Sequence, residues 1–203
     1  IKKLLALTII GNNSAIPAFD RNPTAQVLQT MEEDFLIDCG EGTQMQLSKY
    51  KIKRSRITHI FISHLHGDHY FGLIGLLTSM SLLNRFQDLH IHAPAPLEQL
   101  IKLQLDFASS QLTYKLYFHT LNDKGLIVDT NKITVESFKV KHRIDCWGFI
   151  FREKKNPRKI DAERARIYEV PAAFYNNLQQ GEDYVNKKGT IVPNEEVTTT
   201  APK

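Results

Sequence analysis

The feature that most constrains this chain is a set of four metal-ligand side chains that directly follow a predicted β-strand. Residues 57–63 are rich in β-branched and aromatic side chains, which are typical of a strand. His64 and His66 come next, and in extended backbone residues two positions apart face the same side, so both imidazoles can bind one metal ion. A glycine turn then places Asp68 and His69 where they can bind a second ion. Histidine and carboxylate ligands suit zinc, with manganese as an alternative.

Two simpler explanations of this motif are weaker. Most single histidines are surface residues or core residues with satisfied hydrogen bonds. Here, however, three histidines and an aspartate occur within a stretch of six residues. If this stretch were part of a core, several polar groups would be buried without partners, which is costly. A solvated turn does not need this pattern. Four other histidines match no ligand spacing, and we expect ordinary packing for them: His59, His90, His92 and His119. Cys39 and Cys146 are expected to be small buried residues, because no paired cysteine spacing is present.

Strand and helix patterns alternate over most of the chain, which predicts a mixed α/β fold. The predicted strands are residues 4–10, 24–30, 35–39, 57–63, 89–93, 114–120, 126–129, 133–142 and 147–152, and the predicted helices are residues 44–51, 70–83 and 96–109. After Arg152 the sequence becomes polar, charged and irregular, and residues 194–203 resemble a linker.

The composition restricts the class of protein. The chain has 203 residues, of which 42% are hydrophobic and 24% are charged, so it is long enough for one sizeable domain and has ordinary globular composition. No apolar run approaches the ~20 residues that span a bilayer, and strand-like alternation begins within the first residues. Two cysteines are too few for a disulfide framework. We therefore expect a cytoplasmic protein with neither a membrane partner nor a secretory leader.

Positive charge is concentrated in two windows. The net charge of the chain is +4, and residues 152–166 carry seven basic and three acidic side chains, so this window alone accounts for it. The basic residues of this window are Arg152, Lys154, Lys155, Arg158, Lys159, Arg164 and Arg166. A second window, residues 49–56, holds five basic residues and no acid. Either window is a solvated surface or a surface that binds a phosphate backbone.

The histidine motif and its surroundings resemble a known family. The run from His64 to His69 is similar to the signature of the metallo-β-lactamase superfamily. Within it, the chain resembles the ribonuclease Z family, through residues 11–17 followed by Arg21-Asn22, through Asp38-Cys39-Gly40-Glu41-Gly42-Thr43-Gln44, and through His142-Arg143. This resemblance implies the first half of a four-layer αβ/βα sandwich with one or two zinc ions. It also implies an endoribonuclease that removes 3′ trailers from precursor tRNA by the attack of metal-activated water.

The same resemblance assigns roles to individual residues. It implies that His64, His66 and His142 bind one zinc ion and that Asp68 and His69 bind the other. Without it, His142 is only a histidine at the end of a strand. Asp68 is the candidate general base, because it can contact both metal and water. Asp38 matches an aspartate that orients a ligand histidine.

The resemblance also divides the chain. It implies a core over residues 1–151 and a basic, arm-like insertion over residues 152–193 that grips precursor tRNA, followed by the linker-like tail. Residues 171–181 depart from the pattern of family arms. The family's later aspartate and histidines have no counterpart after His142, so we expect an amino-terminal portion that is inactive alone. The family also suggests a homodimer.

Two alternatives stay open. One is another enzyme of the superfamily, chiefly a broader phosphodiesterase, since the run beginning at Asp38 argues against a thioester or lactam hydrolase. The other is a non-catalytic RNA-binding subunit with an incomplete metal site. An intact histidine motif argues against the second alternative, because a protein that only binds RNA does not need it.

Overall fold

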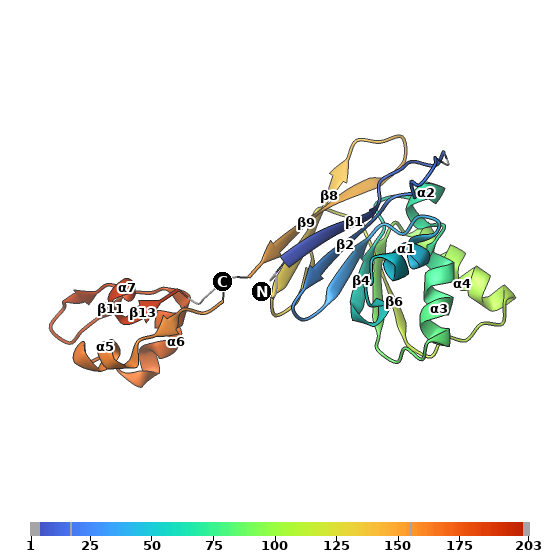
Figure 1. The fold of residues 1–203 in the computed structure, drawn as a ribbon. Helices are drawn as coiled ribbons and strands as arrows, with labels where there is room; N and C mark the ends of the chain where they lie inside the picture. Colours follow the sequence, from blue (N-terminus) through green and yellow to red (C-terminus); the bar gives the residue numbers. More distant parts are fainter. Residues whose placement is uncertain (1–4, 17, 155, 201–203) are drawn as a thin grey trace. The chain divides into compact units, whose positions relative to one another are not determined.

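The computed structural model describes residues 5–16, 18–154 and 156–200 (Figure 1). The chain divides into two compact units, which we describe separately. The first unit comprises Ile1–Asp129 and Thr134–Phe151, and the second comprises Thr130–Ile133 and Arg152–Lys203. No helix in the described part of the chain is long and apolar enough to cross a membrane.

The first unit is built on a six-stranded sheet whose strands follow one another in sequence order. Its strands are β1 (Leu5–Gly11), β2 (Ala25–Thr30), β3 (Asp34–Ile37), β4 (Ile57–Phe61), β5 (Leu89–Ala93) and β6 (Leu116–Thr120). The pairs β1–β2 and β2–β3 are antiparallel, whereas β3, β4, β5 and β6 run parallel. Parallel neighbours require crossover connections, and helices provide them.

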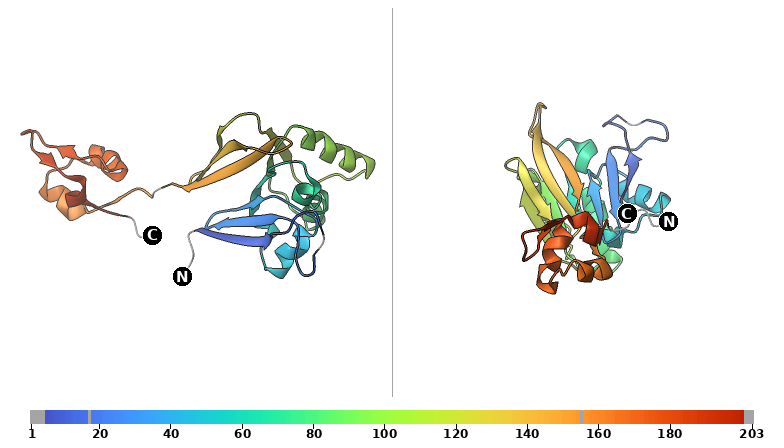
Figure 2. Two further views of the ribbon diagram at one scale, coloured as in Figure 1. Left: turned by 90° about the horizontal axis from the view of Figure 1, so that it is seen from above. Right: turned by 90° about the vertical axis from the view of Figure 1, so that its left-hand side faces the viewer.

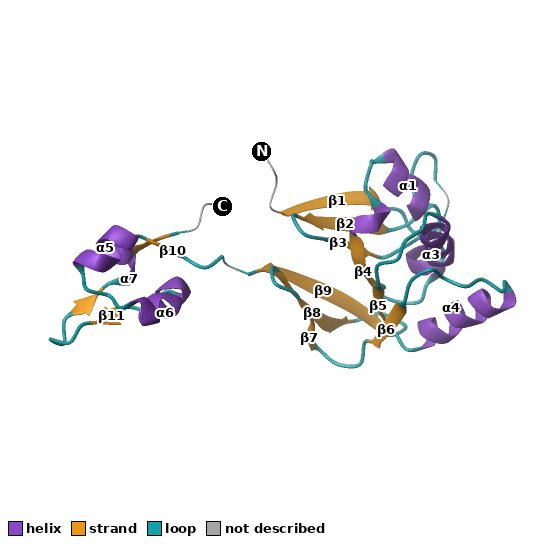
Figure 3. Cartoon of the chain, turned by 90° about the horizontal axis from the view of Figure 1, so that it is seen from below, coloured by secondary structure: helices purple, strands orange, loops and turns teal. Residues whose placement is uncertain are grey.

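The crossover helices cover one face of this sheet (Figure 3). They are α1 (Thr43–Lys49) and η1 (Arg54–Arg56) before β4, α2 (Gly67–Tyr70) and α3 (Leu73–Leu82) before β5, and α4 (Pro96–Phe107) before β6. Alternation along β4 sends Ile60 towards the helices, where it joins a buried cluster with Leu76 of α3 and Ile101 of α4. This apolar layer makes the strand ends rigid supports for the loops that follow them.

A second sheet covers the other face. It contains β7 (Gly125–Asp129), β8 (Ile133–Val140) and β9 (Cys146–Glu153) in that order. In Figure 2 the hairpin of β8 and β9 and the blue strands β1 and β2 belong to separate sheets. Aromatic rings fill the space between the sheets: the Phe61 ring of β4 lies 5.1 Å from that of Phe149 and 5.3 Å from that of Phe151, between ring centroids.

The second unit has a small core of its own. Its elements are β10 (Lys159–Ile160), α5 (Ala162–Ile167), η2 (Ala172–Phe174), α6 (Tyr175–Gln180), β11 (Tyr184–Val185), β12 (Ile191–Val192), α7 (Asn194–Val197) and β13 (Thr198–Thr199). The buried side chains of this core are Ala165, Val170, Leu178, Val192 and Val197. Asp161 caps α5, since its carboxylate accepts hydrogen bonds from the backbone N–H groups of Glu163 and Arg164.

The structure differs from the sequence prediction mainly in this unit. Residues 194–199 form α7 and β13 and are not a linker, because β13 pairs with β10 and Val197 is fully buried in the core. The helices α5 and α6 were not predicted. In the first unit, the predicted elements occur within a few residues of their expected bounds. Leu4, Pro17 and residues 201–203 lie outside the described residues.

Candidate metal centre

The site forms where the loop after β4 meets the loop between β8 and β9. His64 and His66 lie in the loop, Asp68 and His69 lie on the single turn of α2, and His142 lies in the β8–β9 loop. The backbone N–H of Trp147 in β9 donates to the carbonyl of Ser63 at 2.9 Å, which fixes one loop against the other. The fold therefore brings residue 142 next to residues 64–66 across a long stretch of sequence.

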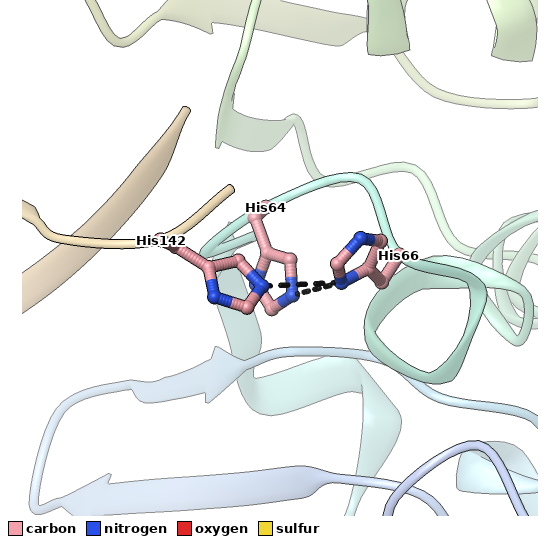
Figure 4. A group of neighbouring side chains, drawn as sticks. All are labelled: His64, His66 and His142. Atoms are coloured by element: carbon pink, nitrogen blue, oxygen red, sulfur yellow. Dashed lines mark hydrogen bonds between the residues drawn. The ribbon is translucent and has the colours of Figure 1, made fainter. Parts of the chain in front are cut away.

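Three imidazoles converge on one point (Figure 4). His66 Nδ1 lies 3.0 Å from His64 Nε2 and 3.3 Å from His142 Nε2. In the part of the chain that is described, these three residues form the one group of at least three histidine, cysteine or carboxylate side chains whose ligand atoms lie within 4.8 Å of one another. Zinc–nitrogen bonds of about 2.1 Å separate the nitrogens of a tetrahedral site by about 3.4 Å. The donor set and its spacing therefore fit a metal ion.

The environment keeps two histidines of this cluster, His64 and His66, in the state that binds metal. Burial, together with the neighbouring His69 and His66, lowers the pKa of His64 to about 4. Desolvation and the Arg143 guanidinium also lower the pKa of His66. Because only the neutral imidazole offers a lone pair, these shifts favour metal binding at neutral pH.

A second pair of ligand atoms lies beside the first cluster. His69 Nε2 is 3.5 Å from Asp68 Oδ2, and the His69 ring centroid is 3.9 Å from that of His64. Asp38 determines how His69 is presented. Its Oδ2 accepts a hydrogen bond from His69 Nδ1 at 2.8 Å, so the proton of the imidazole is on Nδ1 and the lone pair of Nε2 faces Asp68.

Asp38 itself is fixed by its neighbours. Its Oδ1 accepts from the backbone N–H of Ser63 at 2.8 Å, and its Oδ2 accepts from Ser63 Oγ at 3.0 Å. The residue is 5% exposed and has a φ of +57°, a left-handed conformation that aspartate tolerates better than most residues. The structure thus brings together all six residues predicted for this region, and their roles as ligands, base and support are proposals taken up below.

Three further residues contact the site and were not assigned roles from the sequence. Ser63 Oγ lies 3.0 Å from His64 Nδ1, Cys146 Sγ lies 3.7 Å from the same nitrogen, and Arg143 Nε donates to His66 Nε2 at 3.1 Å. The sequence does contain a signal for Ser63 and Arg143, because each of them is next to a candidate ligand histidine. For Cys146 the sequence contains no such signal, because only the packing of β9 places it here.

The basic residues of the window 152–166 differ from one another in their surroundings. Arg158 donates to Thr198 Oγ1 at 2.7 Å, and Arg164 pairs with the Glu196 carboxylate at 3.1 Å, so both stabilise the second unit. Lys159 and Arg166 are exposed. Arg152 and Lys154 both interact with other residues, and Lys155 lies outside the described residues.

The second basic window is partly structural. Arg54 donates to the carbonyl of Gln44 at 2.8 Å, and Arg56 pairs with the buried Asp34 carboxylate at 3.3 Å. These contacts assign two of its five basic residues to the support of the fold. Lys49 pairs with Asp20 at 3.6 Å, but both side chains are exposed, so this pair contributes little stability.

Comparison with solved structures assigns the class of protein. Human tRNase Z, short form, superposes with a TM-score of 0.67 and 35% identity, covering 72% of this chain and 64% of that one. The metallo-β-lactamase fold protein YhfI from Bacillus subtilis superposes with a TM-score of 0.58 and 22% identity over 72% of this chain and 56% of its own, which shows the fold alone. The chain has the metallo-β-lactamase fold, as predicted, and its histidine cluster fits a metal site.

Comparison of sequences assigns the family. The chain belongs to the family described as Anti-Pycsar protein Apyc1, whose model matches residues 5–156. Ribonuclease Z of Bacteroides thetaiotaomicron is 44% identical over 194 residues, which are 95% of this chain and 61% of that protein. Ribonuclease Z of Phocaeicola vulgatus is 45% identical over 193 residues, which are 94% and 62%. The predicted resemblance to ribonuclease Z is confirmed, and the chain spans about three fifths of the length of these relatives.

Proposed function

We propose that the protein is a zinc-dependent endoribonuclease that removes 3′ trailers from precursor tRNA. The observation that carries this proposal is the convergence of His64 Nε2, His66 Nδ1 and His142 Nε2 on one point, in a chain 36–45% identical to several ribonucleases Z. We further propose that it works in the cytoplasm as a homodimer.

The ligand atoms divide into two sets. The three histidine nitrogens of the cluster would hold one ion, and Asp68 together with His69 Nε2 would contribute to a second. Bound zinc would polarise a phosphodiester oxygen and lower the pKa of water towards neutrality. The Asp38 carboxylate keeps the proton of His69 on Nδ1 and leaves Nε2 free as a ligand.

Asp68 is the residue that we assign to proton transfer. Its carboxylate lies beside the cluster at the start of α2, 3.5 Å from His69 Nε2. In this position an Asp68 oxygen can accept a proton from the attacking water and hold that water in line with the phosphorus. The basic residues of the second unit, of which Lys159 and Arg166 are exposed, are proposed to contact the phosphates of tRNA away from the cleaved bond.

The test is cleavage of a precursor tRNA with a 3′ trailer by the protein as its gene encodes it. We expect zinc-dependent release of the trailer, loss of cleavage after chelation and its recovery when zinc is added back. Asp68→Ala should abolish turnover while the far-ultraviolet circular dichroism stays unchanged. Cleavage that survives chelation, or near wild-type turnover by Asp68→Ala, would contradict the proposed site.

A broader phosphodiesterase is the second candidate, because the matching family model carries a description other than ribonuclease. A small chromogenic phosphodiester separates the two functions. A ribonuclease Z should prefer the precursor tRNA by orders of magnitude in kcat/KM, since only the tRNA is large enough to contact basic residues outside the metal centre. Comparable or better hydrolysis of the small diester would favour the broader enzyme.

A further inference from the structure

We infer that Arg143 is a phosphate-binding residue whose hydrogen bond to His66 competes with metal binding, so that a bound metal ion would free its guanidinium for the substrate. The inference deepens the proposed function and rests on it.

Arg143 projects from the β8–β9 loop towards the cluster. Its Nε donates to His66 Nε2 at 3.1 Å, which is its one hydrogen bond among the described residues. Both terminal nitrogens of its guanidinium are therefore without a hydrogen-bond partner in the described part of the chain, and the residue is exposed. A planar group with free donors is thus present at the edge of the histidine cluster.

The hydrogen bond to His66 conflicts with metal binding. A guanidinium N–H can only donate, so His66 Nε2 must accept and the single proton of the neutral ring must be on Nδ1. However, Nδ1 is the atom that points at His64 Nε2 and His142 Nε2, where a metal would bind. A metal ligand needs its lone pair, which moves the proton of His66 to Nε2 and leaves two N–H donors facing each other.

Release of Arg143 has a chemical use. The guanidinium fork matches two phosphate oxygens, and hydrogen bonds between ionised partners are about twice as strong as neutral ones. A phosphodiester that approaches the cluster would enter next to this cation. Metal loading would therefore convert Arg143 from a partner of His66 into a donor to the substrate phosphate.

Two opposite effects of one substitution test the inference. Arg143→Ala removes the competing hydrogen bond, so it should bind zinc about 2- to 10-fold more tightly, a range that follows from the net value of one hydrogen bond. It should also weaken the binding of inorganic phosphate to the zinc-loaded protein about tenfold or more. Arg143→Lys should recover part of the phosphate affinity, because lysine supplies a charge without the bidentate fork.

The measurements are made on the protein as its gene encodes it. Competition with a chromophoric chelator gives the zinc affinity, and calorimetric titration of the zinc-loaded protein gives the phosphate affinity. Lys141→Ala is the matched control, since it removes one exposed positive charge from the same loop. It should change both affinities by less than about twofold, the change expected of screened surface charge.

The outcomes separate this inference from the proposed function. Zinc affinity of Arg143→Ala equal to that of Lys141→Ala, or weaker, would overturn the inference, as would unchanged phosphate affinity. Both readouts are binding constants and do not depend on RNA cleavage. If the two affinities shift as expected and precursor tRNA is not cut by the wild-type protein, the ribonuclease assignment fails while the role of Arg143 stands.

Discussion

At the scale of single residues, the site combines ligands that the sequence shows with supports that it does not. Four candidate ligands are visible because a strand followed by a tight turn presents neighbouring residues on one side, and His64 and His66 illustrate this directly. His142 required the family resemblance, because it comes from a remote hairpin. The sequence does not show which histidine Asp38 contacts. It contacts His69 and no other histidine because its backbone is left-handed and because Ser63 donates hydrogen bonds to its carboxylate.

Removal of Asp38 should weaken the second metal position selectively. In Asp38→Ala, the proton of His69 is no longer fixed on Nδ1, so we expect the affinity for the second zinc ion to fall about 10- to 100-fold, as is typical for partners of metal ligands. The first cluster does not use Asp38 as a direct partner and should keep its affinity. Zinc titration followed by metal analysis measures both steps.

Asp38→Asn tests whether charge or geometry matters at this position. Its amide oxygen can still accept a hydrogen bond from Ser63 or from His69 Nδ1, but the amide carries no charge and its N–H₂ group cannot accept, so an intermediate loss is expected. Equal zinc stoichiometry and affinity in all three proteins would show that Asp38 is irrelevant to metal binding.

At the scale of elements, the sheet carries a row of histidines on the face opposite the helices. His59 of β4 and His92 of β5 share a 3.0 Å contact between ring nitrogens, and His90 of β5 and His119 of β6 share one of 2.9 Å. The sequence predicts ordinary packing for these four, and they do stack with ring centroids 4.6–5.3 Å apart. Their alignment could not be predicted, because it depends on the parallel register of three strands.

This histidine row should make the fold sensitive to acid. Burial lowers the pKa of His92 from 6.5 to about 2, with His119, His59 and His90 acting in the same direction, and burial lowers that of His59 to about 4. Below pH 6.5 the unfolded chain binds protons that the folded chain does not, so the free energy of unfolding should fall as pH falls. For His92 alone the loss approaches about 1.4 kcal/mol per pH unit.

A substitution isolates this effect from the histidines of the metal centre. His92→Phe keeps a ring beside Phe61, whose centroid is 4.7 Å from that of His92, and it removes the group that can be protonated at this position. Urea unfolding between pH 7 and pH 5 should show a smaller decrease for His92→Phe than for wild type. The control is His119→Gln, at an exposed position, which should change the pH dependence less than His92→Phe does. If the free energy of unfolding has the same pH dependence in all three proteins, burial of His92 does not cause the sensitivity to acid.

At the scale of the whole molecule, the chain is two units with separate cores. The first unit was predictable because its strands and helices show regular apolar periodicity, which the buried residues of α3 and β8 follow. The second was not, because its core uses five small or aliphatic side chains scattered over residues 165–197 without a helical or strand period. Its short elements are stabilised by this shared core and not by local propensity.

Because each unit has its own core, damage to the second should leave the metal centre intact. Leu178 is fully buried in α6, so Leu178→Ala should destabilise the second unit by about 2–5 kcal/mol. We expect faster cleavage by a protease within residues 156–200 and unchanged zinc affinity. Leu126→Ala removes the same atoms from a side chain that is 58% exposed in the first unit and should alter neither measurement. A loss of zinc affinity in Leu178→Ala would show that the two cores fold as one, and an unchanged protease pattern would show that Leu178 does not hold the second unit together.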